Sequence, residues 1–214
     1  MSEHSTLRDA EFRLDQLSRR AAAVPLGPVR VGDDLVLLRQ ARWSDGPAWC
    51  RTRQESGERM RLTFGSSTLI DWVEHYIEQR RAVRAGLRVP FLALHEDGRV
   101  IGEMNFHIDP ISGSAELSIW FGLGTPRATV QWITASALFR AFALPARIPR
   151  TTAPIAVTNP GPRRLLAHYG FTEVAMAREL RELGGERVDH DIWWLDRGAD
   201  HLAGLARGMT DPTL

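Results

Sequence analysis

Lysine is absent from this sequence, and all 27 of its basic residues are arginine. The absence excludes mechanisms that need a lysine amine, such as a Schiff base with a carbonyl substrate. Cysteine occurs once, at Cys50, which excludes an internal disulfide and favours a reducing compartment. Because Cys50 follows Trp49 in an apolar helical pattern, we interpret it as a small buried hydrophobic residue and not as a nucleophile.

A charge excess and long hydrophobic runs are also missing. The 27 basic residues are balanced by 26 acidic ones, so the net charge of +1 gives no reason to propose nucleic acid or an anionic membrane as a partner. No apolar run approaches the roughly 20 residues that cross a bilayer. Residues 1–20 are charged and lack the apolar segment of a signal peptide, so we expect a cytoplasmic protein. The seven histidines show no metal-ligand spacing, and no metal is expected.

Turn-forming residues divide the chain into three parts. Apolar residues recur at helical spacing over residues 6–23, and a cluster of proline and glycine follows at residues 25–28. We therefore assign residues 1–28 to an N-terminal helical extension, residues 29–197 to a single domain, and residues 198–214 to a C-terminal tail. The sequence leaves open whether the extension covers a substrate groove, reaches a partner subunit or packs beneath the sheet.

Hydrophobic periodicity predicts alternating strands and helices within the domain. The predicted strands cover residues 34–39, 90–96, 100–108, 115–121, 155–158, 171–176 and 190–195, and the predicted helices cover residues 45–53, 69–85, 129–143 and 160–169. The Asp97-Gly98 turn is of a type that hairpins favour. Because antiparallel hairpins precede a strand, loop and helix unit, we expect an α+β fold and not a doubly wound one.

Polar residues alternate with apolar ones on two neighbouring predicted strands. A hairpin that turns near residues 111–112 would bring these polar side chains together on one face of the sheet. The expected cross-strand partners are His107 with Glu116, Asn105 with Ser118, and Glu103 with Trp120. A slip of one residue would abolish this pairing. The alternative is that these side chains are simply solvated on an open sheet face.

Three segments in this order resemble the GNAT acyltransferases, and in particular the RimJ/RimL type, which acetylates protein N-termini or small amines. They are the hairpin and strand at residues 97–120, residues 159–171 (NPGPRRLLAHYGF), and residues 185–190 (GERVDH). The similarity spans residues 35–195. It implies the GNAT fold, in which helices flank both faces of a mixed and mostly antiparallel central sheet. It also implies acetyl-CoA as the co-substrate.

The resemblance places the CoA pyrophosphate at the loop after residues 115–121, against backbone N–H groups at a helix N-terminus. Pro126 and Ala128 replace the glycines usual in the family, and proline donates no hydrogen bond. The loss costs about 1–3 kcal/mol unless the side chains of Arg127 and Thr129 compensate. The expected cofactor-binding residues are Trp120, Phe121, Gly122, Gly124, Thr125, Arg127, Ala128, Thr129, Asn159 and Arg164.

The resemblance also implies which groups contact pantetheine and which face the phosphates. The backbone at residues 120–122 is expected to pair with pantetheine amides as a peptide strand would. Asn159 is expected to contact pantetheine, to cap the helix that follows, or to do both. Arg163 and Arg164 either reach the CoA phosphates or are ordinary surface charges.

Direct acyl transfer from a thioester to an amine needs a neutral amine and a base, but no covalent nucleophile. Glu116 is the first candidate base, since many GNAT enzymes carry a strand carboxylate at this position, and His107 is the second. An ion-paired surface glutamate is the alternative reading of Glu116. Pro162 stands where RimJ/RimL relatives usually have a serine that protonates the thiolate, which leaves Tyr169 as an alternative donor. His190 with Asp189 is expected to be architectural.

These observations predict an N-acetyltransferase that moves an acetyl group from acetyl-CoA to a primary amine of a protein N-terminus or a small molecule. The substitutions at Pro126, Ala128 and Pro162 support an alternative, in which a GNAT-shaped protein acts as an acyl-CoA sensor or scaffold. The sequence leaves the acceptor and the acyl chain length open. It also allows a homodimer, because Trp193 and Trp194 point to opposite sides of their strand and one ring is either exposed or at a subunit contact.

Overall fold

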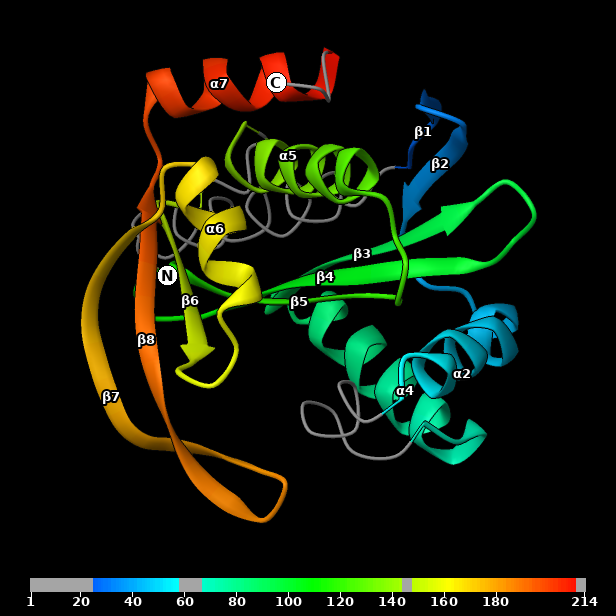
Figure 1. Cartoon of the computed structure of the whole chain (residues 1–214), viewed down its shortest axis with the longest axis horizontal. Helices are drawn as coiled ribbons and strands as arrows, with labels where there is room; N and C mark the ends of the chain where they lie inside the picture. The colour runs from blue at the N-terminus through cyan, green and yellow to red at the C-terminus, as the bar shows by residue number, and fades with distance from the viewer. Residues whose placement is uncertain (1–24, 58–66, 144–147, 211–214) are drawn as a thin grey trace, which may run out of the picture.

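A single sheet of eight strands organises the molecule. The computed structural model describes residues 25–57, 67–143 and 148–210, and its strand order is β1-β2-β3-β4-β5-β6-β8-β7 (Figure 1). The strands are β1 (Leu26–Val31), β2 (Asp34–Arg39), β3 (Arg88–His95), β4 (Val100–Ile108), β5 (Ala115–Phe121), β6 (Arg150–Ala156), β7 (Thr172–Leu183) and β8 (Glu186–Asp196). Neighbouring strands are antiparallel except β5 and β6, which run parallel. The expected mixed, mostly antiparallel α+β sheet is therefore confirmed.

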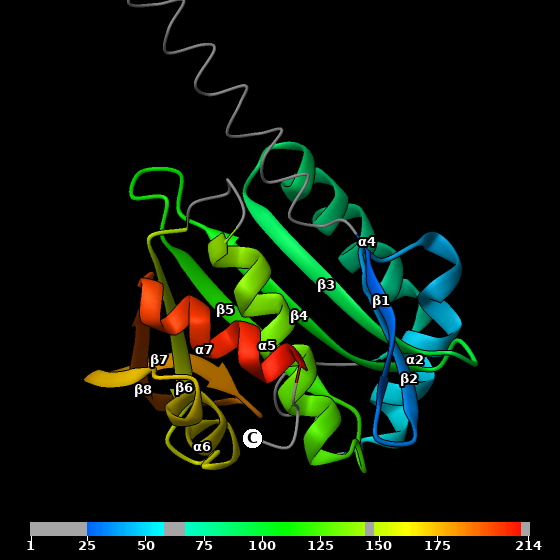
Figure 2. The same cartoon turned by 90° about the horizontal axis from the view of Figure 1, so that it is seen from above.

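Helices cover both faces of this sheet, as expected. Helices α2 (Gly46–Glu55) and α4 (Leu69–Arg84) lie on one face, and α5 (Arg127–Ala143) lies on the other (Figure 1). Helix α7 (Ala199–Thr210) lies across α5 (Figure 2). A short 3-10 turn, Trp43–Asp45, leads into α2, and α6 (Gly161–His168) follows β6.

Local sequence explains why α4, which later provides site residues, begins and ends where it does. Thr68 and Asp71 form a reciprocal capping box at its N-terminus. Gly86, with a φ of +71°, follows its C-terminus in the left-handed conformation that glycine adopts without strain. Both ends of the helix are thus fixed by residues that satisfy its terminal backbone groups.

The apolar core has two parts, one on each face of the sheet. The larger part packs α5 against the sheet and includes Phe91, Phe106 and Leu138. The smaller part lies beneath α2 and α4 and is rich in indole rings, with Trp49, Trp72 and Trp120. Cys50 belongs to this smaller core, its thiol donates to the Thr68 carbonyl, and burial raises its pKa. The interpretation of Cys50 as a buried hydrophobic residue is confirmed.

Strands β5 and β6 separate from each other along their length. They pair at Ala115 with Thr151 and at Glu116 with Thr152, and no further pair between them forms in the described chain. Beyond this point β6 stays paired with β8, so the edge of β5 that faces β6 is left without a strand partner from Leu117 to Phe121. This opening positions the site described below.

Five elements differ from the expectations. Strands β7 and β8 are longer than the expected residues 171–176 and 190–195, because they continue as an exposed hairpin. Strand β1 includes residues 26–28, which the sequence pattern assigns to the extension; it is an edge strand, where Pro28 is tolerated. Strand β6 covers Arg150–Ala156, earlier than the expected residues 155–158, because the broken β5–β6 pairing leaves room for Pro154. The expected tail forms α7, whose Leu205 is buried. The predicted helix at residues 6–23 lies outside the described residues.

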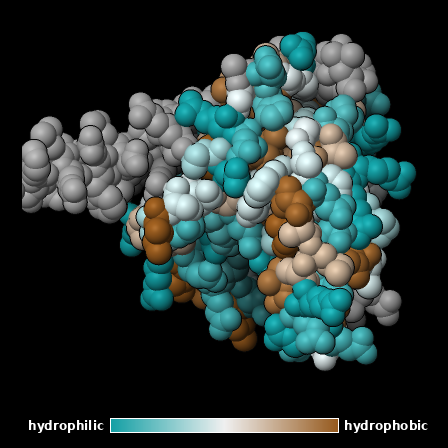
Figure 3. Space-filling model, turned by 90° about the vertical axis from the view of Figure 1, so that its left-hand side faces the viewer, coloured by the Kyte–Doolittle hydropathy of each residue, from teal (hydrophilic) through white to brown (hydrophobic). Residues whose placement is uncertain are grey.

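The hairpin of β7 and β8 forms the far edge of the sheet. Strand β7 is almost entirely exposed, and hydrophobic and hydrophilic side chains are interspersed on this side of the molecule (Figure 3). The Asp189 carboxylate accepts a hydrogen bond from the N–H of Glu179, whose φ is +47°, at a register shift between the strands. His190 is buried, with Nδ1 2.8 Å from the Val188 carbonyl. Asp189 and His190 thus shape the hairpin, as expected.

Candidate active site

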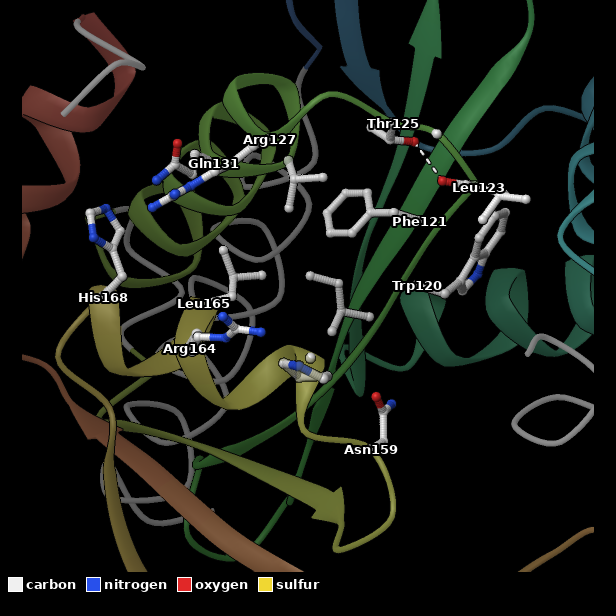
Figure 4. Close-up of a pocket in the computed structure, with 16 residues that line it drawn as sticks. Trp120, Phe121, Leu123, Thr125, Arg127, Gln131, Asn159, Arg164, Leu165 and His168 are labelled. Carbon is white, nitrogen blue, oxygen red and sulfur yellow. Dashed lines mark hydrogen bonds between the residues drawn. The ribbon is translucent and has the colours of Figure 1, made fainter.

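A cavity of about 500 Å³ occupies the opening between β5 and β6, and we call it the splay cavity. Its walls are the C-terminal half of β5, the loop that follows, the first turns of α5, and α6 (Figure 4). The residues of the expected cofactor site that line it are Trp120, Phe121, Gly122, Gly124, Thr125, Arg127, Asn159 and Arg164. Segments far apart in the sequence therefore meet around one cavity.

The loop between β5 and α5 has already used much of its hydrogen-bonding capacity. Three of its N–H groups donate within the protein: Gly122 to the Ile101 carbonyl, Leu123 to the Ser56 hydroxyl, and Thr125 to the Gly122 carbonyl. Pro126 has no N–H to offer. The donors left for an anion are Gly124 and the first turn of α5, whose N–H groups have no partner four residues earlier. The loop is poorer in free donors than its position at a helix N-terminus suggests.

Ala128 and Thr129 do not line the splay cavity. Thr129 is 1% exposed, and its hydroxyl donates to Asp34 at 2.9 Å. Ala128 packs against the larger core. The expected compensation for Pro126 by the Thr129 hydroxyl is therefore contradicted, because that hydroxyl is turned toward β2. What these two residues retain for a ligand is their backbone N–H.

Three basic side chains line the splay cavity. Arg127 and His168 lie near Gln131, and Arg164 extends from α6 beside Leu165 (Figure 4). Neighbouring Arg163 instead forms an ion pair with Asp191. Of the two adjacent arginines, Arg164 is thus the one available to a ligand in the cavity.

Neither residue considered as a proton donor to a thiolate offers a free hydroxyl. Pro162 lines the splay cavity without any donor. Tyr169 does not line it, and its hydroxyl donates to the Gln131 carbonyl at 2.6 Å. Burial raises the pKa of Tyr169. The sequence-based alternative of Tyr169 as a donor therefore conflicts with its hydrogen bond.

A second cavity, of about 410 Å³, lies on the sheet face that α2 and α4 cover; we call it the polar-face cavity. Its sheet wall consists of Arg88, Glu103, Asn105, His107, Ser118 and Trp120. The observed register pairs His107 with Glu116, Asn105 with Ser118, and Glu103 with Trp120. The predicted cross-strand pairing is confirmed, and the face is closed by helices and not openly solvated.

Glu103 is the centre of the polar-face cavity and is 1% exposed. Four side chains contact its carboxylate: Gln79 Nε2 at 2.7 Å, His75 Nε2 at 2.8 Å, Trp120 Nε1 at 3.2 Å and Trp49 Nε1 at 3.3 Å. Burial raises the pKa of Glu103, but the charge of His75 and these hydrogen bonds outweigh it and hold the pKa at about 2. Glu103 is therefore an ionised carboxylate inside the protein.

The two candidate bases lie side by side at the narrow end of the opening. His107 lines the polar-face cavity, and its Nδ1 accepts from Arg88 at 3.2 Å. Burial and then the charge of Arg88 lower the pKa of His107, while Glu116 opposes them. Glu116 lines neither cavity and is paired with Arg181 at 2.5 Å. Each candidate is thus already engaged by an arginine.

The two cavities meet at β5. Trp120 lines both of them, and Ser118 lines the polar-face cavity close to the point where β5 and β6 part. A ligand that follows the free edge of β5 from Gly122 toward Leu117 would bring its end to the polar-face cavity. The arrangement therefore allows two ligands to meet from opposite sides of one strand.

Among the residues that the structure describes, no group of three or more His, Cys, Asp or Glu side chains could hold a metal ion. No helix among these residues is both long and apolar enough to cross a membrane.

The family model described as "Acetyltransferase (GNAT) domain" matches residues 38–192, which is more than half of the chain. The chain belongs to the GNAT acetyltransferase family. The match contains β3 to β6, both loops of the splay cavity, and the polar face of β4 and β5. No curated protein sequence matches this GNAT chain.

Solved structures share the GNAT fold with this chain at low sequence identity. RimJ of Mycobacterium smegmatis, in complex with CoA-disulfide, is 23% identical, with a TM-score of 0.75 over 88% of this chain and 94% of that one. The Salmonella typhimurium acetyltransferase that modifies the N-terminal serine of ribosomal protein L7/L12 is 16% identical, with a TM-score of 0.69 over 80% and 98%. Spermidine N-acetyltransferase of Vibrio cholerae, with CoA and spermine, is 18% identical, with a TM-score of 0.62 over 76% and 95%.

Sequence reasoning missed the contribution of α4 to the site. His75 and Gln79 face Glu103 from this helix, but their four-residue spacing also fits an ordinary amphipathic helix. The available signal was Glu103 itself, since a carboxylate among buried strand residues needs donors from elsewhere. The sequence does not say which helix supplies them.

Proposed function

We propose that this GNAT protein is an N-acetyltransferase that transfers an acetyl group from acetyl-CoA to the primary amine of a peptide N-terminus. The observation that carries the proposal is the meeting of two cavities across β5 at Trp120. One cavity runs beside the free edge of β5 and has the basic side chains that suit CoA, and the other offers a polar chamber for an amine. Holding thioester and amine together is the largest part of what this reaction requires.

Acetyl-CoA is proposed to bind along the unpaired edge of β5. Its pantetheine amides would pair with the backbone from Trp120 to Gly122, as an added strand does. Asn159 lines the same cavity across from β5 and would contact pantetheine. Arg127 and Arg164 would face the phosphates, helped by the N–H groups of Gly124, Ala128 and Thr129.

The chemistry that remains is the removal of one proton and the departure of one thiolate. Glu116 and His107 are the bases proposed from the sequence, acting directly or through water. Arg88 donates to Nδ1 of His107, so His107 must lose this partner before Nδ1 accepts a proton, whereas Arg181 engages Oε1 of Glu116. The thiolate would leave without a dedicated donor, which is tolerable for a thiol with an ordinary pKa of about 8.5.

The lining of the polar-face cavity is more acidic than basic, which suits an amine acceptor. It holds the carboxylates of Asp71, Glu74, Glu78 and Glu103 against two arginines, Arg53 and Arg88. Arg88 pairs with Glu78 at 2.7 Å, and Glu103 is contacted by His75. Structural neighbours include an acetyltransferase that modifies the N-terminal serine of L7/L12 and a spermidine N-acetyltransferase. The proposal takes the first of these acceptor classes, and the assay below compares it with the second.

One observation favours a second candidate function. The loop before α5 has three of its N–H groups engaged, and Pro126 and Pro162 remove two donors that the family uses. A GNAT-fold protein that binds acyl-CoA without turnover, as a sensor or scaffold, would tolerate these losses. The single cysteine agrees with a cytoplasmic location for either candidate function.

Thiol release from acetyl-CoA tests the proposal and separates the candidates. The purified chain is assayed with peptides of varied first residue, the same peptides with blocked N-termini, and polyamines. Release with free peptides and none with blocked ones is expected. Release with polyamines alone would reject the peptide acceptor. No release with any amine, together with acetyl-CoA binding by calorimetry, would reject the enzyme and favour the sensor.

Kinetics of two variants then test the bases proposed from the sequence. If one of the two is the base, its variant, Glu116→Gln or His107→Gln, lowers kcat by roughly 100-fold or more, whereas the other variant keeps its turnover. A Glu116→Gln variant with intact turnover at every pH would remove Glu116 from the mechanism.

A further inference from the structure

The polar-face cavity contains a histidine whose surroundings suit proton transfer better than those of either base proposed above. His75 of α4 lines this cavity, and 23% of its side chain is exposed, so a ligand can reach it. Its ring stacks on Trp49, with the ring centroids 5.3 Å apart and the planes 21° from parallel. Its Nε2 lies 2.8 Å from the buried carboxylate of Glu103. The ring is therefore fixed in both position and orientation.

The contact with Glu103 determines which ring nitrogen is free. An ionised carboxylate only accepts hydrogen bonds, so Nε2 of His75 must carry a proton and donate it to Glu103. In the neutral imidazole, the lone pair is then on Nδ1. Nδ1 of His75 has no hydrogen-bond partner among the residues that the structure describes. A buried carboxylate, an oriented imidazole and a bare ring nitrogen form the arrangement that supports a general base.

The comparison with His107 shows why the two histidines differ. Arg88 donates to Nδ1 of His107, so in the neutral ring the lone pair of that nitrogen is already engaged. His75 needs no such partner to leave before it accepts a proton. The other titratable or charged residues that line the cavity are Arg53, Asp71, Glu74, Glu78, Arg88 and His107.

We propose that His75, oriented by Glu103, is the base that takes the proton from the attacking amine; this proposal rests on the proposed N-acetyltransferase function. The neutral amine nitrogen attacks the thioester carbonyl carbon, the new C–N bond forms, and the C–S bond breaks. The proton lost by the nitrogen moves to Nδ1 of His75 and then passes through solvent to the CoA thiolate. The products are the N-acetyl peptide and CoA thiol, and His75 is returned to its neutral form. Glu103 does not touch the substrate and acts as a positioning residue.

The test uses His75→Gln with His201→Gln as the matched control. A glutamine at position 75 can still donate to Glu103 but cannot accept the proton, while His201 is exposed on α7 and lines neither cavity. We expect His75→Gln to lower kcat by roughly 100-fold. Its KM and calorimetric Kd for acetyl-CoA should match those of the wild type, as should all values for His201→Gln.

The pH profile separates a base from a structural residue. Loss of one ionisation should lower by one the logarithmic slope of the acidic limb of kcat/KM for His75→Gln. A variant within about twofold of wild-type kcat, with an unchanged acidic limb, would overturn the proposal. A fall in kcat together with a similar-fold loss of acetyl-CoA affinity, or together with a clearly lower melting temperature, would also overturn it, since that pattern marks a structural role.

A measurement without turnover completes the test. Nitrogen chemical shifts of the His75 ring should show the proton on Nε2 in the neutral form, and a proton on Nδ1 would contradict the proposal. A wild type that acetylates no amine would instead reject the proposed function. A wild type that is active beside an equally active His75→Gln would reject the role of His75 alone.

Discussion

The two cavities on either side of β5 are lined by different kinds of groups. The splay cavity is lined largely by loop backbone and by side chains that point into it independently, such as Arg127, Asn159 and Arg164. The polar-face cavity is lined by side chains that bind one another, with four donors converging on Glu103. The first cavity is suited to hold a ligand by many small contacts. The second has its geometry fixed before any ligand arrives.

This difference predicts different responses to mutation. A change in the splay cavity should alter affinity and leave the fold intact, because its side chains support little else. A change at the centre of the polar-face cavity should alter stability as well, because a buried donor without its acceptor costs free energy. Each prediction below tests one side of this contrast, from the largest expected effect to the smallest.

Replacing Glu103 is expected to have the largest effect. Glu103→Gln should lower the free energy of unfolding at pH 7 by about 3 kcal/mol, because the native pKa of about 2 lies below the ordinary 4.5. Urea denaturation measures this loss. Glu74→Gln, at an exposed position on α4, is the control and should change the stability by less than about 0.5 kcal/mol.

The stabilisation by Glu103 should also depend on pH with a definite sign. A carboxyl whose folded pKa is lowered contributes its full stability above the unfolded pKa and loses it as the pH falls toward the folded one. The difference between wild type and Glu103→Gln should therefore be fully present just above about pH 4.5 and shrink between there and about pH 2. A difference that stays constant down to pH 3 would show that Glu103 is not the ionised centre described here.

Adjacent arginines offer a matched pair in the splay cavity. Arg164→Ala and Arg127→Ala should each weaken acetyl-CoA binding about tenfold, because each removes a charge-assisted contact. Arg163→Ala should leave the Kd within about twofold, since Arg163 pairs with Asp191. Isothermal titration calorimetry measures all three. An Arg163 effect as large as that of Arg164 would contradict the assignment of the two side chains.

Thr129 tests whether a residue beside the splay cavity can affect only the fold. Thr129→Val preserves the shape and removes the hydrogen bond to Asp34, so the free energy of unfolding should fall by about 1 kcal/mol. The Kd for acetyl-CoA should not change. A clear loss of acetyl-CoA affinity without a loss of folding stability would show that the Thr129 hydroxyl binds phosphate after all.

Pro126 gives the smallest expected effect and the opposite sign. Pro126→Ala adds an N–H group at the start of α5, where an anion is expected, and should tighten acetyl-CoA binding about threefold. Calorimetry under the same conditions detects this change. Weaker binding would show that the rigidity of proline at this position matters more than the missing donor.

The sequence was sufficient for the parts of the fold that depend on local pattern. The polar alternation of β4 and β5 and the turn between them predicted both strands and their register. It was insufficient for β1 and β6, because both strands contain proline, which argues against a strand in the sequence. The sheet tolerates these prolines because each strand lacks a neighbour along part of one edge. Helix α7 was not predicted because its apolar residues are sparse. Leu202, Leu205 and Met209 form an apolar face only where the helix packs against α5.

The same limit applies to the site. Contiguous motifs predicted most of the splay cavity, but no local signal said that the Thr129 hydroxyl turns to Asp34. The polar-face cavity combines β4 and β5, whose pairing was predicted, with α2 and α4, which were predicted as helices but not placed over this face. His75 was invisible as a functional residue because its partner, Glu103, lies 28 residues away in the chain.

The most direct test of the account is the affinity of a conjugate in which CoA sulphur is joined through an acetyl linker to the amine of an accepted peptide. If the cavities meet at β5, the conjugate should bind at least about 100-fold more tightly than CoA alone. Ser118→Phe, which fills the polar-face cavity, should abolish this gain and leave CoA binding unchanged. Equal affinity of conjugate and CoA for the wild type would contradict the central claim that acyl donor and amine meet across this strand.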